Sequence, residues 1–184
     1  MKNKIVIIFS LIFISTQGQE WLDKSCKSIG KQITAEAFIA SQKRNVLNVV
    51  INQAGVIELN GKAKTNLTEI AFKEQILDFV TNPQSDKSKA EKPEKVFIQL
   101  KSLNKDSKTE AALKTYIQEV YLYLWDKNAE DKYSSSYIDL NCKKRAKVFN
   151  NYPLRLIVGF EEKVEKKRPR GVGVPTFNGD VNDN

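Results

Sequence analysis

Residues 45–62 read NVLNVVINQAGVIELNGK, and this stretch sets the fold that the sequence predicts. Its first part, 46–51, is rich in β-branched residues and has the length of a strand. The cluster at 52–55 is typical of a turn. A second strand-like run, 56–59, ends at an Asn-Gly pair, which favours positive φ. The stretch therefore predicts a β-hairpin that opens the folded part of the chain.

An amphipathic helix is predicted directly after the hairpin. Asn66 and Glu69 have the spacing of a capping box. The pattern ends at Asn82-Pro83, because proline disfavours helix in the residue before it. The apolar residues at helical spacing between these points are Phe72, Ile76, Phe79 and Val80.

A second, longer helix is predicted further along the chain. Ser107 and Glu110 form a capping box, and the apolar stripe that follows extends the helix to about Asn128 or beyond. The stripe consists of Leu113, Tyr116, Ile117, Val120, Tyr121 and Leu124.

The remaining segments complete the expected order of elements. Residues 83–95 predict a mobile surface loop with almost nothing to bury, and residues 96–100 predict a short central strand. Residues 131–150 are predicted to be irregular and basic, and 154–160 predict the last strand. Together these segments predict an α+β fold, a two-layer sandwich of a small mixed β-sheet with two helices on one face, in the order β-β-α-β-α-β.

The two ends of the chain predict appendages to this domain. Residues 1–18 have a basic start, a short apolar run and small residues before Gln19, the order found in a secretory signal peptide. The apolar run is too short to span a bilayer; an uncleaved anchor is the alternative. We expect a partly helical tether at 19–44, the domain at 45–160 and a disordered tail at 161–184.

Export would place the two cysteines in a compartment where they can form a disulfide. In an oxidising compartment Cys26 and Cys142 can form a disulfide, and two free thiols are the alternative. Such a bridge would close a loop of more than a hundred residues, for which the chain-entropy model gives about 4–5 kcal/mol.

The composition argues against an enzyme and against a metal or cofactor site. The chain has no histidine, which removes the commonest general base and leaves two cysteines unable to complete a zinc site. No Gly-rich phosphate loop is present in the sequence. The net charge of +8 is spread along the chain as on an ordinary solvated surface, and we expect no nucleic-acid partner.

A partner surface is expected at two aromatic residues off the helical stripe and at a basic run in the irregular segment that follows. Tyr123 and Trp125 lie outside the apolar face of the second helix, and aromatic residues are enriched in interface cores. A basic run nearby could contact an anion, with a solvated loop as the alternative; it comprises Lys143, Lys144, Arg145 and Lys147. The exposed edges of the sheet are further candidates, since an unpaired edge accepts an added strand.

The ordered set of segments over about 45–160 resembles the extracytoplasmic domain of the ExbD/TolR family. The stretch 45–62 is similar to the family's opening hairpin, with its Asn-x-x-Gly turn and closing Asn-Gly pair. The helix at 67–82, the strand at 96–100 and the segment 151–156 before the last strand follow in the family's order. The second helix is similar in the residues Tyr116, Gln118, Glu119, Val120 and Tyr121.

This resemblance implies a role in a Gram-negative-type envelope. Family members work with ExbB/TolQ-like channel subunits and couple the proton gradient to TonB- or TolA-like proteins in biopolymer transport, using an intramembrane aspartate. The apolar run of this chain has no acid, and its first acid is Glu20. What the resemblance implies is therefore an exported, periplasmic, homodimeric binding module with ExbB/TolQ-, TonB- or ExbD-like partners. The alternatives are a subunit anchored in the inner membrane by its N-terminal apolar run, and a peptidoglycan-binding envelope protein.

Overall fold

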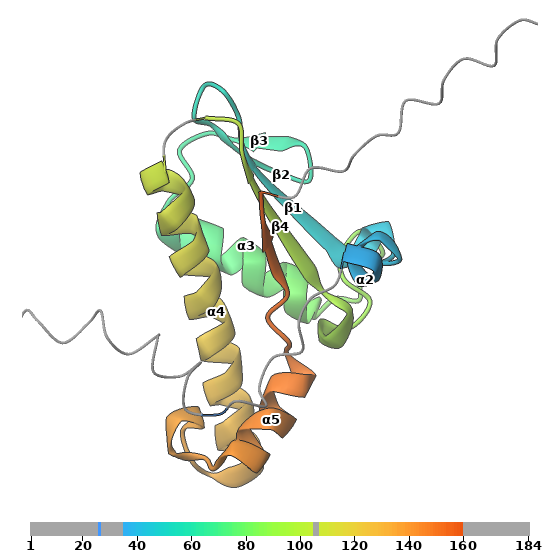
Figure 1. Ribbon diagram of the computed structural model, residues 1–184, viewed down its shortest axis with the longest axis vertical. Coiled ribbons are helices and arrows are strands. Elements are labelled where there is room, and N and C mark those ends of the chain that lie inside the picture. The colour runs from blue at the N-terminus through green and yellow to red at the C-terminus, as the bar shows by residue number, and fades with distance from the viewer. Residues whose placement is uncertain (1–25, 27–34, 105–106, 160–184) are drawn as a thin grey trace, which may run out of the picture.

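The computed structural model describes residues 26, 35–104 and 107–159 (Figure 1). The predicted signal peptide, the predicted tail and all of residues 19–34 except Cys26 lie outside the described residues. In chain order the helices and strands are α2 (Ala35–Ile39), β1 (Val46–Ile51), β2 (Ile57–Leu59), β3 (Lys62–Lys64), α3 (Glu69–Thr81), β4 (Phe97–Ser102), α4 (Ser107–Tyr133), α5 (Cys142–Asn151) and β5 (Leu156–Val158). Three short 3-10 turns lie between them: η1 (Lys43–Asn45), η2 (Pro93–Lys95) and η3 (Tyr137–Asp139).

The strands form one five-stranded mixed sheet in the order β3-β2-β1-β4-β5. β1 pairs antiparallel with β2, and β2 with β3. β1 pairs parallel with β4, and β4 with β5. The mixed sheet with its packed helices confirms the predicted α+β fold.

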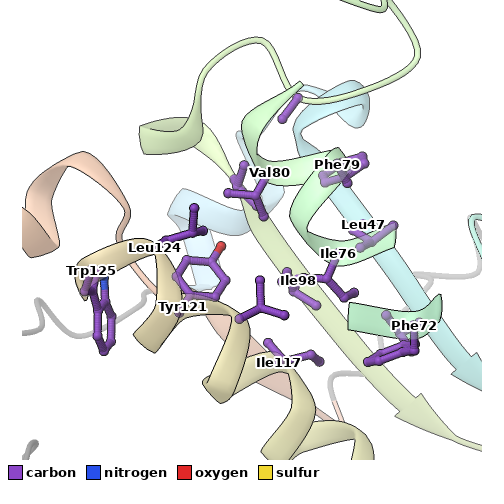
Figure 2. Packing of buried hydrophobic residues seen from close by; sticks show 14 of the residues in the cluster. Leu47, Phe72, Ile76, Phe79, Val80, Ile98, Ile117, Tyr121, Leu124 and Trp125 are labelled. Carbon is purple, nitrogen blue, oxygen red and sulfur yellow. The ribbon is translucent and has the colours of Figure 1, made fainter. Parts of the chain in front are cut away.

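The core lies between α3, α4 and one face of the sheet. Alternate residues of β1 are buried, and Leu47 stands beside Ile98 of β4 in the parallel register. Ile76 from α3 and Ile117 from α4 lie in the same cluster (Figure 2). Fully burying an aliphatic side chain contributes about 1.5–3 kcal/mol, so this layer holds the two helices on the sheet.

The predicted hairpin is confirmed, and a third strand extends it. Asn52 forms the first turn, with its Oδ1 accepting hydrogen bonds from the N–H groups of Ala54 and Val56 (both 3.0 Å). Asn60 and Gly61 have positive φ (49° and 76°) and return the chain into β3. The Asn-Gly pair is therefore a second hairpin turn rather than the end of the sheet, as this pair favours.

The first helix starts later than the sequence predicted. Thr68, not Asn66, is its N-cap, and its Oγ1 accepts from the N–H of Ala71 (3.2 Å). The predicted end is confirmed: the helix stops at Thr81, and Asn82 follows in the left-handed region. Asn66 also has positive φ, a conformation that short polar residues tolerate, and it belongs to the turn that precedes the cap.

The loop at 83–95 does bury a residue, against our expectation. Ala90 is fully buried, and Asn82 Nδ2 donates to its carbonyl oxygen (2.7 Å). The buried Asn45 accepts from the N–H of Glu91 through its Oδ1 (2.8 Å). Two asparagine side chains thus fasten a loop whose composition is almost entirely polar.

The segment 131–150 is largely helical, and the prediction of an irregular segment was wrong. α4 continues to Tyr133, and α5 begins after the N-cap Asn141, whose Oδ1 accepts from the N–H of Lys144 (3.0 Å). The apolar face of α5 is narrow, and one of its buried residues is an arginine, Arg145. Hydrophobic periodicity therefore carried too little signal to reveal the helix.

Replacing Tyr121 with phenylalanine should leave the protein as stable or raise its free energy of unfolding by about 1 kcal/mol. Its ring is fully buried, and its hydroxyl finds no hydrogen-bond partner among the described residues. Burial raises the pKa of Tyr121, and an unsatisfied buried hydroxyl costs about 1–3 kcal/mol. Urea denaturation would measure the change, with Tyr116→Phe on the half-buried side of α4 as the control. A loss of more than about 1 kcal/mol in Tyr121→Phe would mean that the hydroxyl has a partner.

Candidate interaction surface

Trp125 does not belong to a partner surface, which corrects the prediction. Only 6% of the residue is exposed, and its Nε1 donates to the carbonyl oxygen of Tyr152 (2.8 Å). Its ring stacks on Tyr137 (5.2 Å between centroids) and packs against Phe149 (5.5 Å). The physical reason is that η3 and α5 pack against α4 and bury a second face of that helix. The apolar stripe predicted for α4 gave no indication of this second face.

Arg145 is likewise unavailable as an anionic contact. It is 5% exposed, and its guanidinium lies over the ring of Tyr137 (5.6 Å from Cζ to the centroid). Its Nε donates to the carbonyl oxygen of Tyr137 (3.1 Å), and its Nη2 donates to that of Ile138. Arg145 therefore ties η3 to α5, a use suited to its planar group of several donors.

The three lysines of the same run are exposed on α5. Lys143, Lys144 and Lys147 are all exposed, and Lys144 Nζ lies 5.0 Å from the ring centroid of Tyr133. Three of the four basic candidates are therefore exposed, and the arginine is buried.

Cys26 and Cys142 are joined by a disulfide, with 5.5 Å between their Cα atoms. Cys26 is 3% exposed, and Cys142 is the first residue of α5. The bridge therefore fastens the segment before α2 to the start of α5, the element that Trp125 and Arg145 also hold in place. Disulfides persist mainly in oxidising compartments.

Tyr123 is exposed, as predicted, and forms one wall of a groove between α3 and α4. The residue is 53% exposed, and Ile70 on the other wall is 70% exposed. The groove has a volume of about 370 Å³. Its lining consists of Ile70, Lys73, Glu74, Leu77, Glu119, Val120 and Tyr123. The sequence held one signal for this site, since Ile70 and Leu77 are seven residues apart and lie off the core stripe of α3.

The polar rim of the groove carries more carboxylates than cations. Lys73 Nζ lies 2.5 Å from Glu69 Oε1 and 2.5 Å from Glu119 Oε2. These hydrogen bonds, first to Glu119 and then to Glu69, raise the pKa of Lys73. Hydrogen bonding to Lys73 lowers the pKa of Glu69, so this pair stabilises the fold above the usual glutamate pKa and loses that effect as the pH falls. Among the described residues, no ion pair joins Glu74 to a cation.

The two edges of the sheet differ in their readiness to accept a strand. β3 carries Lys62 and Lys64, and edge lysines discourage pairing with another chain. β5 is the apolar run Leu156–Val158, and within the described residues no strand pairs with its outer side. The carbonyl oxygen of Arg155 and the N–H of Gly159 both bond to β4 (2.9 and 3.1 Å). Since alternate residues of a parallel strand face the same neighbour, the backbone groups of residues 156 and 158 face the open edge.

The other face of the sheet is partly covered at the β4 end. Phe97 is buried between Phe38 of α2, whose ring lies edge-on at 5.7 Å, and Arg155, whose Cζ lies 5.0 Å from the Phe97 centroid. Helix α2 belongs to the predicted partly helical tether at 19–44, and it is the α-helical part of that tether among the described residues. The contact of Phe38 brings α2 against Phe97, beside Arg155 at the start of β5, and no described element covers the outer edge of that strand.

The described residues contain neither a cluster of metal-ligating side chains nor a helix that could cross a membrane. No three cysteine or acidic side chains gather there closely enough to hold a metal ion. Each helix in the same part of the chain is too short or too polar to cross a bilayer.

Comparison with known proteins found no matching family model, no matching curated protein and no matching solved structure.

Proposed function

We propose that this chain is an exported ExbD/TolR-like module of a Gram-negative-type envelope that binds partners in a TonB- or Tol-like transport or energy-coupling system. The outer edge of β5, which no strand of the described residues pairs with, is the observation that carries the binding role, because an apolar edge strand can accept a strand from another chain. The link between Cys26 and Cys142 supports an oxidising location. The module has no intramembrane acid in its apolar run, so any proton-driven step belongs to its partners.

The function rests on strand addition at one edge, and the first partner that we propose is a second copy. A homodimer would pair the two β5 edges, since the lysines of β3 oppose pairing at the other end of the sheet. Envelope partners of ExbB/TolQ, TonB or ExbD type would use the same edge or compete for it. Peptidoglycan is the second candidate partner, which the exposed cationic side chains of Lys143, Lys144 and Lys147 favour.

Replacing Val158 with proline should block the edge without disturbing the fold. The N–H of residue 158 faces the open side, so proline removes an edge donor and leaves the β4–β5 hydrogen bonds of Arg155 and Gly159 in place. Loss of this donor from both copies should weaken self-association by about tenfold or more, since each net hydrogen bond is worth about 0.5–1.5 kcal/mol. Sedimentation equilibrium of the purified mature chain would measure the effect.

Val158→Thr is the matched control, because it keeps the N–H and the β-branched shape. We expect it to associate like the unchanged chain, and both variants to retain its urea midpoint. The proposal fails if the unchanged protein stays monomeric and captures no partner from an envelope extract. Equal association of the proline and threonine variants would reject the β5 edge as the contact.

A further inference from the structure

The groove between α3 and α4 takes no part in the proposed edge pairing and has its own chemistry. Its floor is apolar, formed by Leu77 and Val120, and its walls are the exposed side chains of Ile70 and Tyr123. Glu74, Glu119 and Lys73 line the groove, and Lys73 also pairs with Glu69 beside it, in a protein whose net charge is +8. The groove is thus a locally acidic, apolar slot on a basic molecule, and a segment with cationic and apolar residues in sequence would complement it.

The chain contains such a segment outside the described residues. Residues 166–177 read KKRPRGVGVPTF. Four of the first five residues are cationic, and the rest includes two valines, a proline and a phenylalanine. Over the described part of the chain, the one stretch of five residues with four cations is 143–147, which is held in α5 and includes the buried Arg145. The complement of the groove therefore lies in the same polypeptide.

The segment is long enough to reach the groove from the end of β5. Gly159 is the last described residue, and an extended chain spans about 3.3–3.6 Å per residue. The link from Gly159 to Lys166 can therefore cover about 25 Å, and that to Phe177 about 60 Å. A domain of this size has a radius of gyration of about 14 Å, so most of its surface is within reach.

A tethered segment also fits the size of the groove better than a second copy does. A stable dimer needs about 800 Å² buried on each partner, whereas this slot offers two apolar floor residues and two walls. A linked segment acts at an effective concentration in the millimolar range, so modest complementarity is enough to occupy the site.

We propose that residues 166–177 dock in the α3–α4 groove of their own chain. The cations of 166–170 face Glu74, Glu69 and Glu119, and the apolar residues that follow cover Leu77 and Val120. The groove is then occupied by a segment of its own chain, and a partner with the same pattern of cationic and apolar residues would compete with that segment for the groove.

Photo-cross-linking from position 123 of the full-length chain tests this directly. Tyr123→p-benzoylphenylalanine places a reactive ketone on the groove wall and keeps an aromatic ring at an exposed site. After irradiation and trypsin digestion we expect a cross-link within one molecule to the peptide from Gly171 to Asn184. Ile138→p-benzoylphenylalanine is the matched control, since Ile138 is an exposed apolar residue in η3 and does not line the groove. It should yield no such product.

A charge reversal distinguishes docking from chance contact. Glu74→Lys, made in the position-123 cross-linking chain, should lower the cross-link yield about fivefold or more, in line with the loss of surface charge pairs worth up to about 1 kcal/mol each. Glu94→Lys makes the same change in net charge on η2, which does not line the groove, and should leave the yield unchanged. A covalent dimer, a cross-link to another segment, or equal yields in the two lysine variants would overturn the proposal.

Discussion

Replacing both Cys26 and Cys142 with alanine is expected to lower the free energy of unfolding by about 4–5 kcal/mol. The bridge joins residues 116 apart in sequence, and a loop of that length removes a large entropy from the unfolded chain. Total stability is commonly about 5–15 kcal/mol, so the alanine variant would be marginal or unfolded near 37 °C. Urea denaturation at 25 °C followed by circular dichroism would measure the loss.

Two comparisons isolate the covalent link. The unchanged chain, reduced with an excess of dithiothreitol, should lose nearly as much stability as the double alanine variant. Cys142→Ala by itself should equal the double variant, because one cysteine cannot close the loop. If the free energy of unfolding fell by less than about 1 kcal/mol in the double variant, the single variant and the reduced chain alike, the disulfide would not be what stabilises the fold.

Trp125→Ala is expected to cost about 3–5 kcal/mol, the range for removing a large aromatic side chain from a core. The indole fills the space between α4, η3 and α5 and donates to the Tyr152 carbonyl oxygen, so truncation leaves both a cavity and an unpaired acceptor. We expect α5 to lose protection from amide hydrogen exchange before α3 does. Chemical denaturation with far-ultraviolet circular dichroism, together with hydrogen exchange, would measure both effects.

Tyr123→Ala on the same helix is the matched control for Trp125. Tyr123 is exposed, two residues earlier, and its truncation should change stability by about 0.5 kcal/mol or less. Similar losses in the two variants would show that the packing of Trp125 against Tyr137 and Phe149 does not hold η3 and α5 on α4. Trp125→Phe should give an intermediate loss, because it keeps the ring contacts and removes the donor to Tyr152.

The sequence predicted those parts of the fold whose pattern is local. The hairpin followed from a β-branched run and an Asn-x-x-Gly turn, and the α4 stripe correctly placed Ile117 and Tyr121 in the core. β3 was missed because it is three residues long and consists of Lys, Ala and Lys. No alternation of apolar and polar residues marks so short an edge strand.

The errors at the candidate site have a shared cause in tertiary packing. Trp125 was expected at the surface because it lies beside the apolar stripe predicted for its helix, and Arg145 because the sequence predicted no helix at all over 131–150. Both are buried because η3 and α5 pack onto α4, a contact that only the folded chain creates. Tyr123 was placed correctly, since no element of the described structure covers that side of α4.

The α3–α4 groove could not be predicted in full, since its two walls come from helices separated by β4. Ile70 and Leu77 signalled an off-stripe apolar pair, but only the fold brings Tyr123 and Glu119 opposite them. The ion pairs of Lys73 likewise depend on the approach of α4 to α3. Sites made by one element are visible in a sequence, whereas sites made between elements need the packing.

The intact mass of the native protein in fractionated cells distinguishes an exported binding module from an anchored subunit. We expect a soluble envelope protein that begins near Gln19 and is two hydrogen atoms lighter than its reduced sequence, because Cys26 and Cys142 are linked. A membrane-bound chain that begins at Met1 and carries two free thiols would contradict this expectation and favour the anchored transport subunit.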